Sequence, residues 1–176
     1  MLVGWSCPSQ REAASDNRRM QAQDNALIGA AGEHFILYQL LSRNLIAALS
    51  PRNTHVADIV VFGPSMSVGS MVQVKTRTAR QGKGWIMGAK NEDLDHPRLF
   101  YALLDVEPEV PEVLVVPSRI VADVLRREHA AWLAIPGKGG RPHRDSSARR
   151  LAPSYSHHVP GLEADGWMPI ATAGPS

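Results

Sequence analysis

The residues from Ala57 to Thr76 constrain the fold more than any other stretch of the sequence. They read as A-D-I-V-V-F, the loop G-P-S-M-S-V-G-S, and M-V-Q-V-K-T. Two β-branched runs around a Gly/Pro/Ser turn predict a β-hairpin with a rather long loop. Because strand side chains alternate, Gln73 and Lys75 share one face of the second strand. If the loop closes symmetrically, Asp58 lies directly opposite Lys75, about 5 Å away at Cβ, and diagonal to Gln73, about 7 to 8 Å away.

These three polar side chains allow two interpretations. A cross-strand ion pair between Asp58 and Lys75, with a neighbouring amide, would contribute little to stability if it is exposed. An acid, an amide and an amine that converge at one end of a hairpin could instead form a binding or catalytic site. The hairpin alone does not decide between the two, so the choice depends on the rest of the chain.

The composition is that of one soluble globular domain. The chain has 176 residues, of which 44% are hydrophobic and 20% are charged, enough for a substantial core. No apolar run is long enough to span a bilayer, and the first residues lack the basic and apolar regions of a secretory signal. The single Cys7 allows no internal disulfide and no thiolate metal cluster. These features predict a cytoplasmic protein without a membrane partner.

The net charge of +2 is unevenly distributed along the chain. Residues 71–90 contain five Lys or Arg and no acid, and residues 138–150 contain five Lys or Arg and one Asp. By contrast, residues 101–128 contain six acids and three Arg. Two basic segments in a chain that is nearly neutral overall indicate that a polyanion binds on one side of the protein. The alternative is that these segments are ordinary solvated charge runs.

A long helix is predicted from Asp24 or Asn25, either of which is a suitable N-cap, to about Asn44. Residues 1–23 are polar, have no apolar period and are expected to form an N-terminal arm. The apolar stripe of the helix includes Leu37, Leu40 and Leu41.

This stripe places Glu33 on the buried side of the helix. A buried carboxylate is costly unless it is paired or bound to a metal, so Glu33 should have a partner. A cap on a neighbouring strand or a pair with an Arg is the alternative to a metal site. Gly29 and Gly32 each cost about 1 kcal/mol in a helix relative to Ala, which indicates the close approach of another backbone.

Further strands are predicted over residues 44–51, 98–106 and 112–118, and residues 77–90 are expected to form a loop or another short strand. A second helix should begin with Ser118 as its N-cap and have a core side made of Ile120, Val121, Val124, Leu125 and Trp132. Residues 136–176 are rich in Pro, Gly and basic side chains and are expected to wrap on the domain, with a short helix near Ser146–Leu151. The prediction is therefore an α/β domain over residues 24–135, with a mixed β-sheet of about five strands flanked by helices.

A helix with Glu33, a strand with Asp58 and a strand with Gln73-x-Lys75 resemble the PD-(D/E)XK nuclease superfamily. The likeness is to the branch in which Gln replaces the second acid, which includes many bacterial proteins. The resemblance spans residues 29–124 and implies a restriction-endonuclease-like core. Ala57 stands where the family name has Pro, and Gln73 takes the place of a metal-binding carboxylate, so the resemblance leaves open whether catalysis is retained.

The resemblance also implies a role for each residue. Asp58 would be the central ligand of Mg²⁺ or Mn²⁺, with oxygens added by the Gln73 amide and the Val74 carbonyl, and Glu33 would hold the ion directly or through water. Lys75 would position or help deprotonate the attacking water. This chemistry is consistent, since Mg²⁺ prefers oxygen ligands and a nearby ammonium adds electrostatic stabilisation to that of the ion.

The expected substrate is DNA, and seven basic residues are candidates for its phosphates: Arg77, Arg80, Lys83 and Lys90 after the active strand, and Arg144, Arg149 and Arg150 in the tail. The first hypothesis is a metal-dependent endonuclease. The alternatives are an inactive nuclease-fold protein that binds nucleic acid or a protein partner, and an interaction protein with an incidental ion pair. Double-strand cleavage by so small a chain would need two active sites, which a homodimer would supply.

Overall fold

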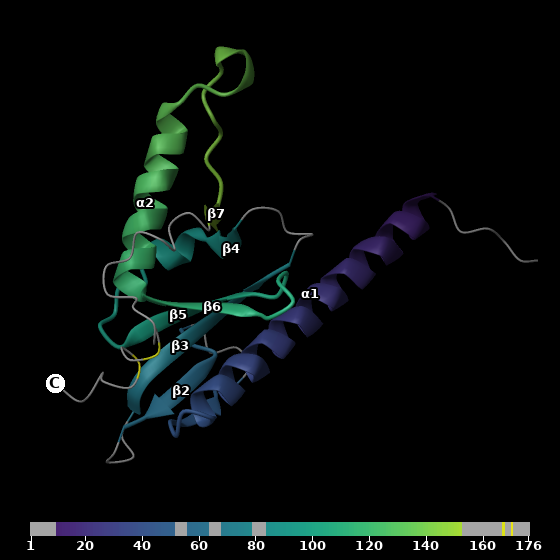
Figure 1. Cartoon of the computed structure of the whole chain (residues 1–176). Helices are drawn as coiled ribbons and strands as arrows, with labels where there is room; N and C mark the ends of the chain where they lie inside the picture. Colours follow the sequence, from purple (N-terminus) through teal and green to yellow (C-terminus); the bar gives the residue numbers. More distant parts are fainter. Residues whose placement is uncertain are drawn as a thin grey trace, which may run out of the picture.

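A computed structural model describes residues 10–51, 56–63, 68–78 and 84–152 together with Trp167 and Ile170. Five strands form one mixed sheet in the order β1-β2-β3-β5-β6 (Figure 1). Neighbouring strands are antiparallel except for β3 and β5, which are parallel. The strands are β1 (Ile46–Leu49), β2 (Ile59–Phe62), β3 (Val68–Arg77), β5 (Leu99–Asp105) and β6 (Glu112–Pro117). The predicted α/β class, with a mixed sheet of about five strands flanked by helices, is confirmed.

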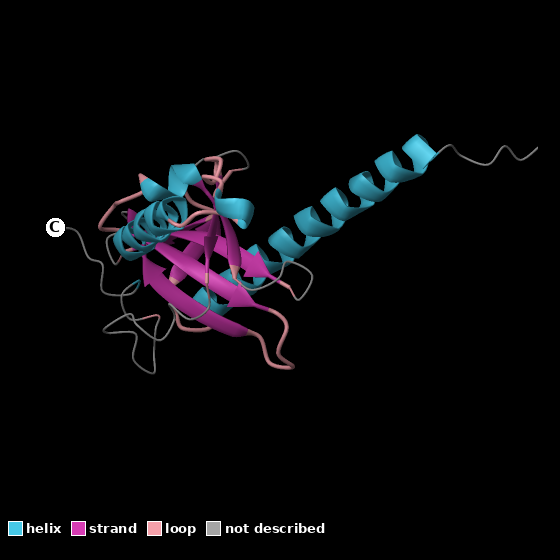
Figure 2. Cartoon of the chain, turned by 90° about the horizontal axis from the view of Figure 1, so that it is seen from above, coloured by secondary structure: helices cyan, strands magenta, loops and turns pink. Residues whose placement is uncertain are grey.

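The two faces of the sheet are covered by different elements (Figures 1 and 2). Helix α1 (Gln10–Leu41) packs Ile36 and Leu40 onto one face, against Val72, Val74 and Leu104 among others. The other face is covered by α2 (Ser118–Ala134) and by a small antiparallel sheet of β4 (Trp85–Gly88) and β7 (Ala148–Leu151). Strand alternation divides β3 and β5 between these two cores.

Helix α1 begins at Gln10, so the predicted start at Asp24 or Asn25 was wrong. Residues 10–23 have no Gly or Pro and are rich in Ala, Gln and Arg, which favour helix. A missing apolar period in the sequence therefore does not exclude a helix. Figure 2 shows this part of α1 extending beyond the sheet. Although α1 is long, no helix in the described ranges is apolar over a stretch sufficient to cross a membrane.

One of the two helix glycines marks a close contact with the sheet. A Cβ on Gly32 would lie 1.9 Å from Thr76 Oγ1 and 3.3 Å from Leu104 Cδ2, whereas a Cβ on Gly29 would meet nothing within 4 Å. The predicted close approach therefore occurs at Gly32, where the neighbours are side chains of β3 and β5 rather than a backbone. This contact places α1 close to the C-terminal end of β3.

The second half of the chain departs from the predictions at its element boundaries. Ser118 is the first residue of α2 and not its cap, because its buried hydroxyl exchanges hydrogen bonds of 2.9 and 3.0 Å with the backbone of His96. Val121, Val124 and Leu125 are buried as predicted, but Trp132 is 42% exposed because α2 outruns the core. Residues 148–151 form strand β7 instead of a helix, since pairing with β4 overrides their local preference.

Candidate active site at the end of the hairpin

The pairing of β2 with β3 differs from the register expected for a symmetric loop. Ile59 pairs with Val72, so Asp58 comes beside Gln73 and Val74 instead of directly opposite Lys75. The shift arises because β3 starts at Val68, earlier than predicted, and pairs with β2 through an irregularity after Val61.

A contact from the distant C-terminal segment accompanies this early start. Ser70 is fully buried, and its hydroxyl donates a 3.0 Å hydrogen bond to the carbonyl of Ile170. The sequence around the loop gives no sign of a partner one hundred positions away.

The Asp58 carboxylate is held by two donors from β3. The Val74 backbone N–H donates to Oδ2 at 2.7 Å, and Gln73 Nε2 donates to the same oxygen. Asp58 is partly buried, Val74 is largely buried, and Gln73 is 9% exposed. The acid and the amide therefore form a fixed pair at the N-terminal end of β2.

Lys75 lies within reach of the charges on three other segments. Burial lowers the pKa of Lys75 from its ordinary value, and the positive charge of Lys90 lowers it further. The negative charges of Asp58 and Glu33 act in the opposite direction and raise the pKa of Lys75. Charged side chains from α1, from the residue before β2 and from the short helix η2 (Ala89–Glu92) therefore act on the ammonium group that β3 carries.

Tyr101 and Asn91 belong to the same neighbourhood and were missed by the sequence analysis. Tyr101, fully buried on β5 beside Gln73, donates from its hydroxyl to Asn91 Oδ1 at 2.8 Å. Burial and the charge of Asp58 raise the pKa of Tyr101 to about 12. Asn91 in turn donates to the Gly88 carbonyl at 2.8 Å, which fixes η2 and its exposed Lys90. The sequence feature that could have indicated a buried polar contact here is the tyrosine within the apolar run L-F-Y-A-L-L.

The oxygen donors of this site suit a hard divalent cation. Asp58 and Glu33 offer carboxylates, Gln73 an amide oxygen and Val74 a backbone carbonyl, which match the ligand types of Mg²⁺ and Mn²⁺. Gln73 presents its nitrogen to Asp58, so its amide would have to rotate to offer oxygen. The part of the chain that the structure describes holds no group of three or more His, Cys, Asp or Glu arranged for a metal.

Arg77, a predicted phosphate contact, is engaged inside the protein. Its guanidinium forms an ion pair with Asp105, lies 3.9 Å from Glu107 Oε2, and stacks 5.2 Å from the centre of the Trp85 ring. Its side chain is only 14% exposed. This arrangement argues for a structural role. Of the other candidates after β3, Arg80 and Lys83 lie outside the described residues, whereas Lys90 is exposed next to the site.

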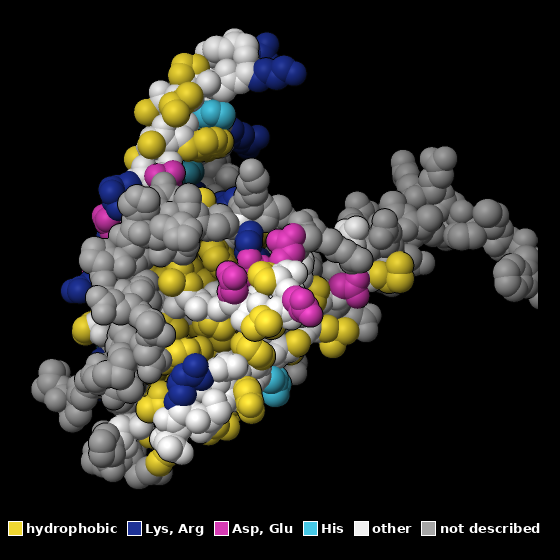
Figure 3. Space-filling model, in the orientation of Figure 1, with side chains coloured by type: hydrophobic (Ala, Val, Ile, Leu, Met, Phe, Trp, Pro, Cys, Tyr) yellow, Lys and Arg dark blue, Asp and Glu magenta, His cyan; other side chains and the backbone are white. Residues whose placement is uncertain are grey.

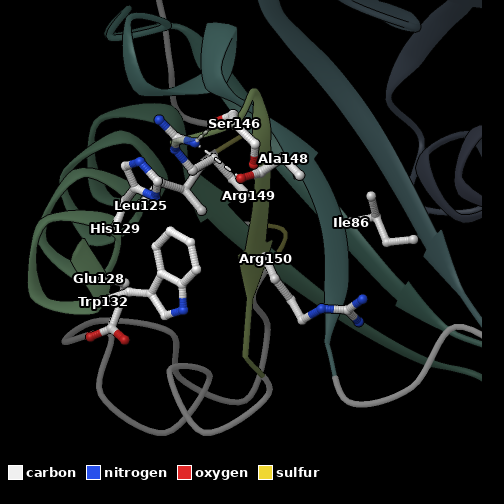
Figure 4. A pocket seen from close by; sticks show the side chains of 9 residues that line it. All are labelled: Ile86, Leu125, Glu128, His129, Trp132, Ser146, Ala148, Arg149 and Arg150. Carbon is white, nitrogen blue, oxygen red and sulfur yellow. Dashed lines mark hydrogen bonds between the residues drawn. The ribbon is translucent and has the colours of Figure 1, made fainter. Parts of the chain in front are cut away.

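The candidates in the tail belong to a different part of the molecule. Arg149 is paired with Glu92 and its side chain is 8% exposed, so its charge is also used internally. Arg150 lines a cleft of about 410 Å³ between α2, β4 and β7, together with Ile86 and Trp132 (Figure 4). Arg144 is exposed. The structure therefore does not gather the five basic candidates that it describes around the hairpin.

The cleft is bordered by an arm that stands away from the main sheet (Figure 1). Residues 135–147 leave the end of α2 and return toward β7. Trp132 stacks on His143 with ring centres 4.0 Å apart, and His129 Nε2 hydrogen bonds Asp145 Oδ1 at 2.8 Å. This bond lowers the pKa of the exposed Asp145. Lys and Arg side chains are visible near the end of the arm (Figure 3), and the arm includes the exposed residues Lys138, Arg141 and Arg144.

A scan against protein families finds no match, and a search of the curated proteins finds no relative of this chain.

Proposed function

We propose that this protein hydrolyses DNA phosphodiester bonds with the help of Mg²⁺ or Mn²⁺, and that Glu33, Asp58, Gln73 and Lys75 form its active site. The observation that carries the proposal is the environment of Lys75. Its ammonium is partly desolvated and lies in the fields of two carboxylates, one of which is fixed by Gln73 and Val74. A solvated surface ion pair would not be held in this way.

The order of the elements supports a restriction-endonuclease-like core. Helix α1 carries Glu33. Asp58 directly precedes β2, and the adjacent strand β3 carries Gln73 and Lys75. Strands β2 and β3 belong to one mixed sheet that has helices on both faces. The pattern that resembles the PD-(D/E)XK superfamily in the sequence is therefore compatible with the three-dimensional arrangement.

Each residue has a chemical role under this proposal. The divalent ion, when bound, would supply Lewis-acid stabilisation of the phosphoryl oxygens and a water of lowered pKa. Asp58 and Glu33 would hold it, with oxygens from Gln73 and the Val74 backbone. Lys75 would orient the attacking water and offset the negative charge that develops in the transition state. Because its pKa is lowered, Lys75 can also release a proton more readily than an exposed lysine.

DNA would contact the exposed basic residues rather than the buried ones. Lys90 lies beside the site on η2, and Arg144 and Arg150 lie on the arm and in the cleft. Phosphate contacts of this kind give affinity and position without reading sequence. Arg80 and Lys83 stay candidates from their place in the sequence, whereas Arg77 and Arg149 are assigned to folding by their ion pairs.

The test is nicking of supercoiled plasmid in Mg²⁺ or Mn²⁺. Wild-type protein should nick the DNA, and Asp58→Asn and Lys75→Met should each remove the activity. The matched control is Asp95→Asn, which changes an exposed acid just after η2. Full activity of Asp58→Asn, or activity in excess EDTA, would overturn the proposal.

A second candidate function is nucleic-acid binding without turnover. It is favoured by the Gln73–Asp58 hydrogen bond, which satisfies the carboxylate without an ion. Titration calorimetry with Mn²⁺ separates the two functions. If Gln73 is a ligand, Gln73→Glu should increase the affinity, because a charged oxygen replaces a neutral one. An unchanged affinity, together with salt-sensitive DNA binding in EDTA and no cleavage, would favour the binding function.

A further inference from the structure

The outward face of α1 carries an apolar stripe that takes no part in the domain core. The core side of the helix is formed by Gly32, Ile36 and Leu40, which pack on the sheet. Four large apolar side chains of α1 are instead exposed by about half or more: Met20 at 62%, Leu27 at 62%, Tyr38 at 63% and Leu41 at 49%. At 3.6 residues per turn they lie in a narrow line opposite Ile36.

The spacing along this line is that of a helix that pairs with another helix. Positions separated alternately by four and three residues form the 3.5-residue repeat of a coiled-coil seam. We define the outer stripe as the positions with this spacing, which are Met20, Asp24, Leu27, Ala31, His34, Tyr38 and Leu41. All seven are exposed. A helix that is apolar on two opposite faces has two surfaces to bury, and the sheet covers only one of them.

The shape of the molecule leaves room for a second helix. The N-terminal part of α1 extends away from the sheet in both views (Figures 1 and 2). Met20 and Leu27 are exposed along the described part of this extension, and helices gain most of their stability from packing an apolar face, so a partner that buries these side chains would stabilise it.

The charges of this helix favour a second copy of the same chain in antiparallel orientation. Between Met20 and Leu41 the sequence has two acids, Asp24 and Glu33, and no Lys or Arg. A parallel pair would bring the two Asp24 carboxylates together at the seam, which is unfavourable. An antiparallel pair centred on Ala31 would instead place Asp24 near the Tyr38 hydroxyl of the second copy. The small Ala31 side chain would let the helices approach at the crossing point.

The available area is that of a modest dimer interface. Taking roughly 200 Å² for a large side chain, the four exposed apolar side chains offer about 450 Å² per copy. Polar atoms beside the stripe, along about 33 Å of helix, bring the contact near the roughly 800 Å² per partner of a standard interface. An area of this size is sufficient for a specific dimer.

We propose that the outer stripe of α1 pairs antiparallel with the outer stripe of a second copy. The pairing does not depend on the proposed nuclease activity. If that activity is present, the dimer supplies the two active sites that a double-strand cut requires.

The test is the mass of the full chain by sedimentation equilibrium over about 1 to 100 µM. Wild type should dimerise, and Leu27→Glu and Tyr38→Glu should each weaken the dimer at least tenfold while the far-UV circular dichroism is retained. The matched control is Val110→Glu, which adds the same charge at an apolar residue exposed by 75% between β5 and β6 and should leave the dimer intact. A wild type that stays monomeric overturns the proposal, and so does a dimer that both stripe variants leave unchanged.

Cross-linking tests the orientation in a Cys7→Ser background. In the antiparallel pair, Ala31→Cys should form a symmetric disulfide, whereas Leu27→Cys should not, because it faces His34 of the second copy. Equal cross-linking at both positions would indicate a parallel pair and overturn the antiparallel arrangement. A monomer in which Leu27→Glu lowers the Tm would show that another segment of the same chain covers the stripe.

Discussion

Two polar clusters lie side by side along β3 and handle charge in opposite ways. At Arg77 the guanidinium is paired with Asp105 and stacked near Trp85, so its charge is balanced within the fold. At Lys75, two positions earlier, burial outweighs the attraction of Asp58 and lowers the pKa of the ammonium. The first arrangement stabilises the joint between β3 and β5. The second keeps an incompletely compensated ammonium at the end of the hairpin.

A structural polar cluster and a functional one differ in how completely their charges are compensated. Each cluster pairs a basic residue of β3 with an acid from another segment, and both are largely buried. They differ in whether the charges satisfy each other, because natural proteins seldom leave a desolvated charge uncompensated without a use for it. The proposed function therefore belongs to the Lys75 cluster. Matched substitutions in the two clusters test this assignment.

The largest effect is expected from matched substitutions of the two aspartates. Asp58→Asn should lower the rate of DNA cleavage about 10³-fold or more, since it removes a metal-binding charge, and should change stability little. Asp105→Asn should instead cost about 3 kcal/mol of unfolding free energy, because Arg77 loses its buried partner. Plasmid nicking and urea unfolding of both variants measure this.

The two clusters would not differ in role if the two aspartates behaved alike. Cleavage per folded molecule should be preserved in Asp105→Asn at a temperature where the variant is folded. An equal loss of cleavage in both would place Asp105 in the active site.

A smaller effect is expected where α1 meets β3 between the two clusters. Gly32→Ala would force a Cβ against Thr76, so it should cost about 1 to 3 kcal/mol and lower cleavage by moving Glu33. Gly29→Ala meets nothing and should stabilise by up to about 1 kcal/mol through helix propensity. Thermal unfolding and nicking of both variants provide the measurement.

Thr76→Ala supplies the internal control for this contact. The buried Thr76 hydroxyl has no hydrogen-bond partner within the described ranges, so its removal should be cheap. The double variant with Gly32→Ala should recover most of the lost stability. If it does not, the contacts that Thr76→Ala leaves in place, with Cβ of residue 76 at 3.1 Å and with Leu104 Cδ2 at 3.3 Å, are the ones that matter.

The sequence predicted the elements of this fold better than the way in which they meet. Period and composition identified the sheet, both helices and the hairpin, because burial on one face leaves a regular pattern. The register failed because early pairing at Val68 accompanies a contact between Ser70 and Ile170, which no local pattern reports. The start of α1 failed because residues 10–23 form a helix although their sequence has no apolar period.

Only those residues of the candidate site that lie close together in the sequence could be predicted to meet. Asp58 and Gln73-x-Lys75 share a hairpin, so their proximity followed from strand geometry. Tyr101 and Asn91 come from β5 and η2, and only the parallel pairing of β3 with β5 brings them in. The internal pairing of Arg77 and Arg149 was equally hidden, since Asp105 and Glu92 are distant in the sequence.

Titration of Tyr101 tests the geometry of the Lys75 cluster without any assay of function. Its pKa of about 12 should separate it from an exposed tyrosine near 10 in a spectrophotometric titration at 295 nm. Asp58→Asn should lower the pKa of Tyr101, because a negative charge that opposes phenolate formation is removed. Asp105→Asn should not. Since the folded-state pKa is raised, the stability that Tyr101 contributes is present below pH 10 and is lost as the pH rises toward 12.

The smallest effect concerns the stability cost of the Lys75 charge. Its pKa is lowered in the folded state, so the unfolded chain binds more protons, and stability should rise with pH between the folded-state pKa and 10.5. Lys75→Met removes this dependence and should raise the Tm at pH 7, with a gain that shrinks as the pH approaches 10.5. Arg77→Met should do the reverse and lower the Tm, because it leaves Asp105 without its partner. Scanning calorimetry of both variants across this range compares a charge that costs stability with one that provides it. A Tm that falls equally in both would mean that Lys75 is held as firmly as Arg77, and the contrast from which the active site was inferred would be lost.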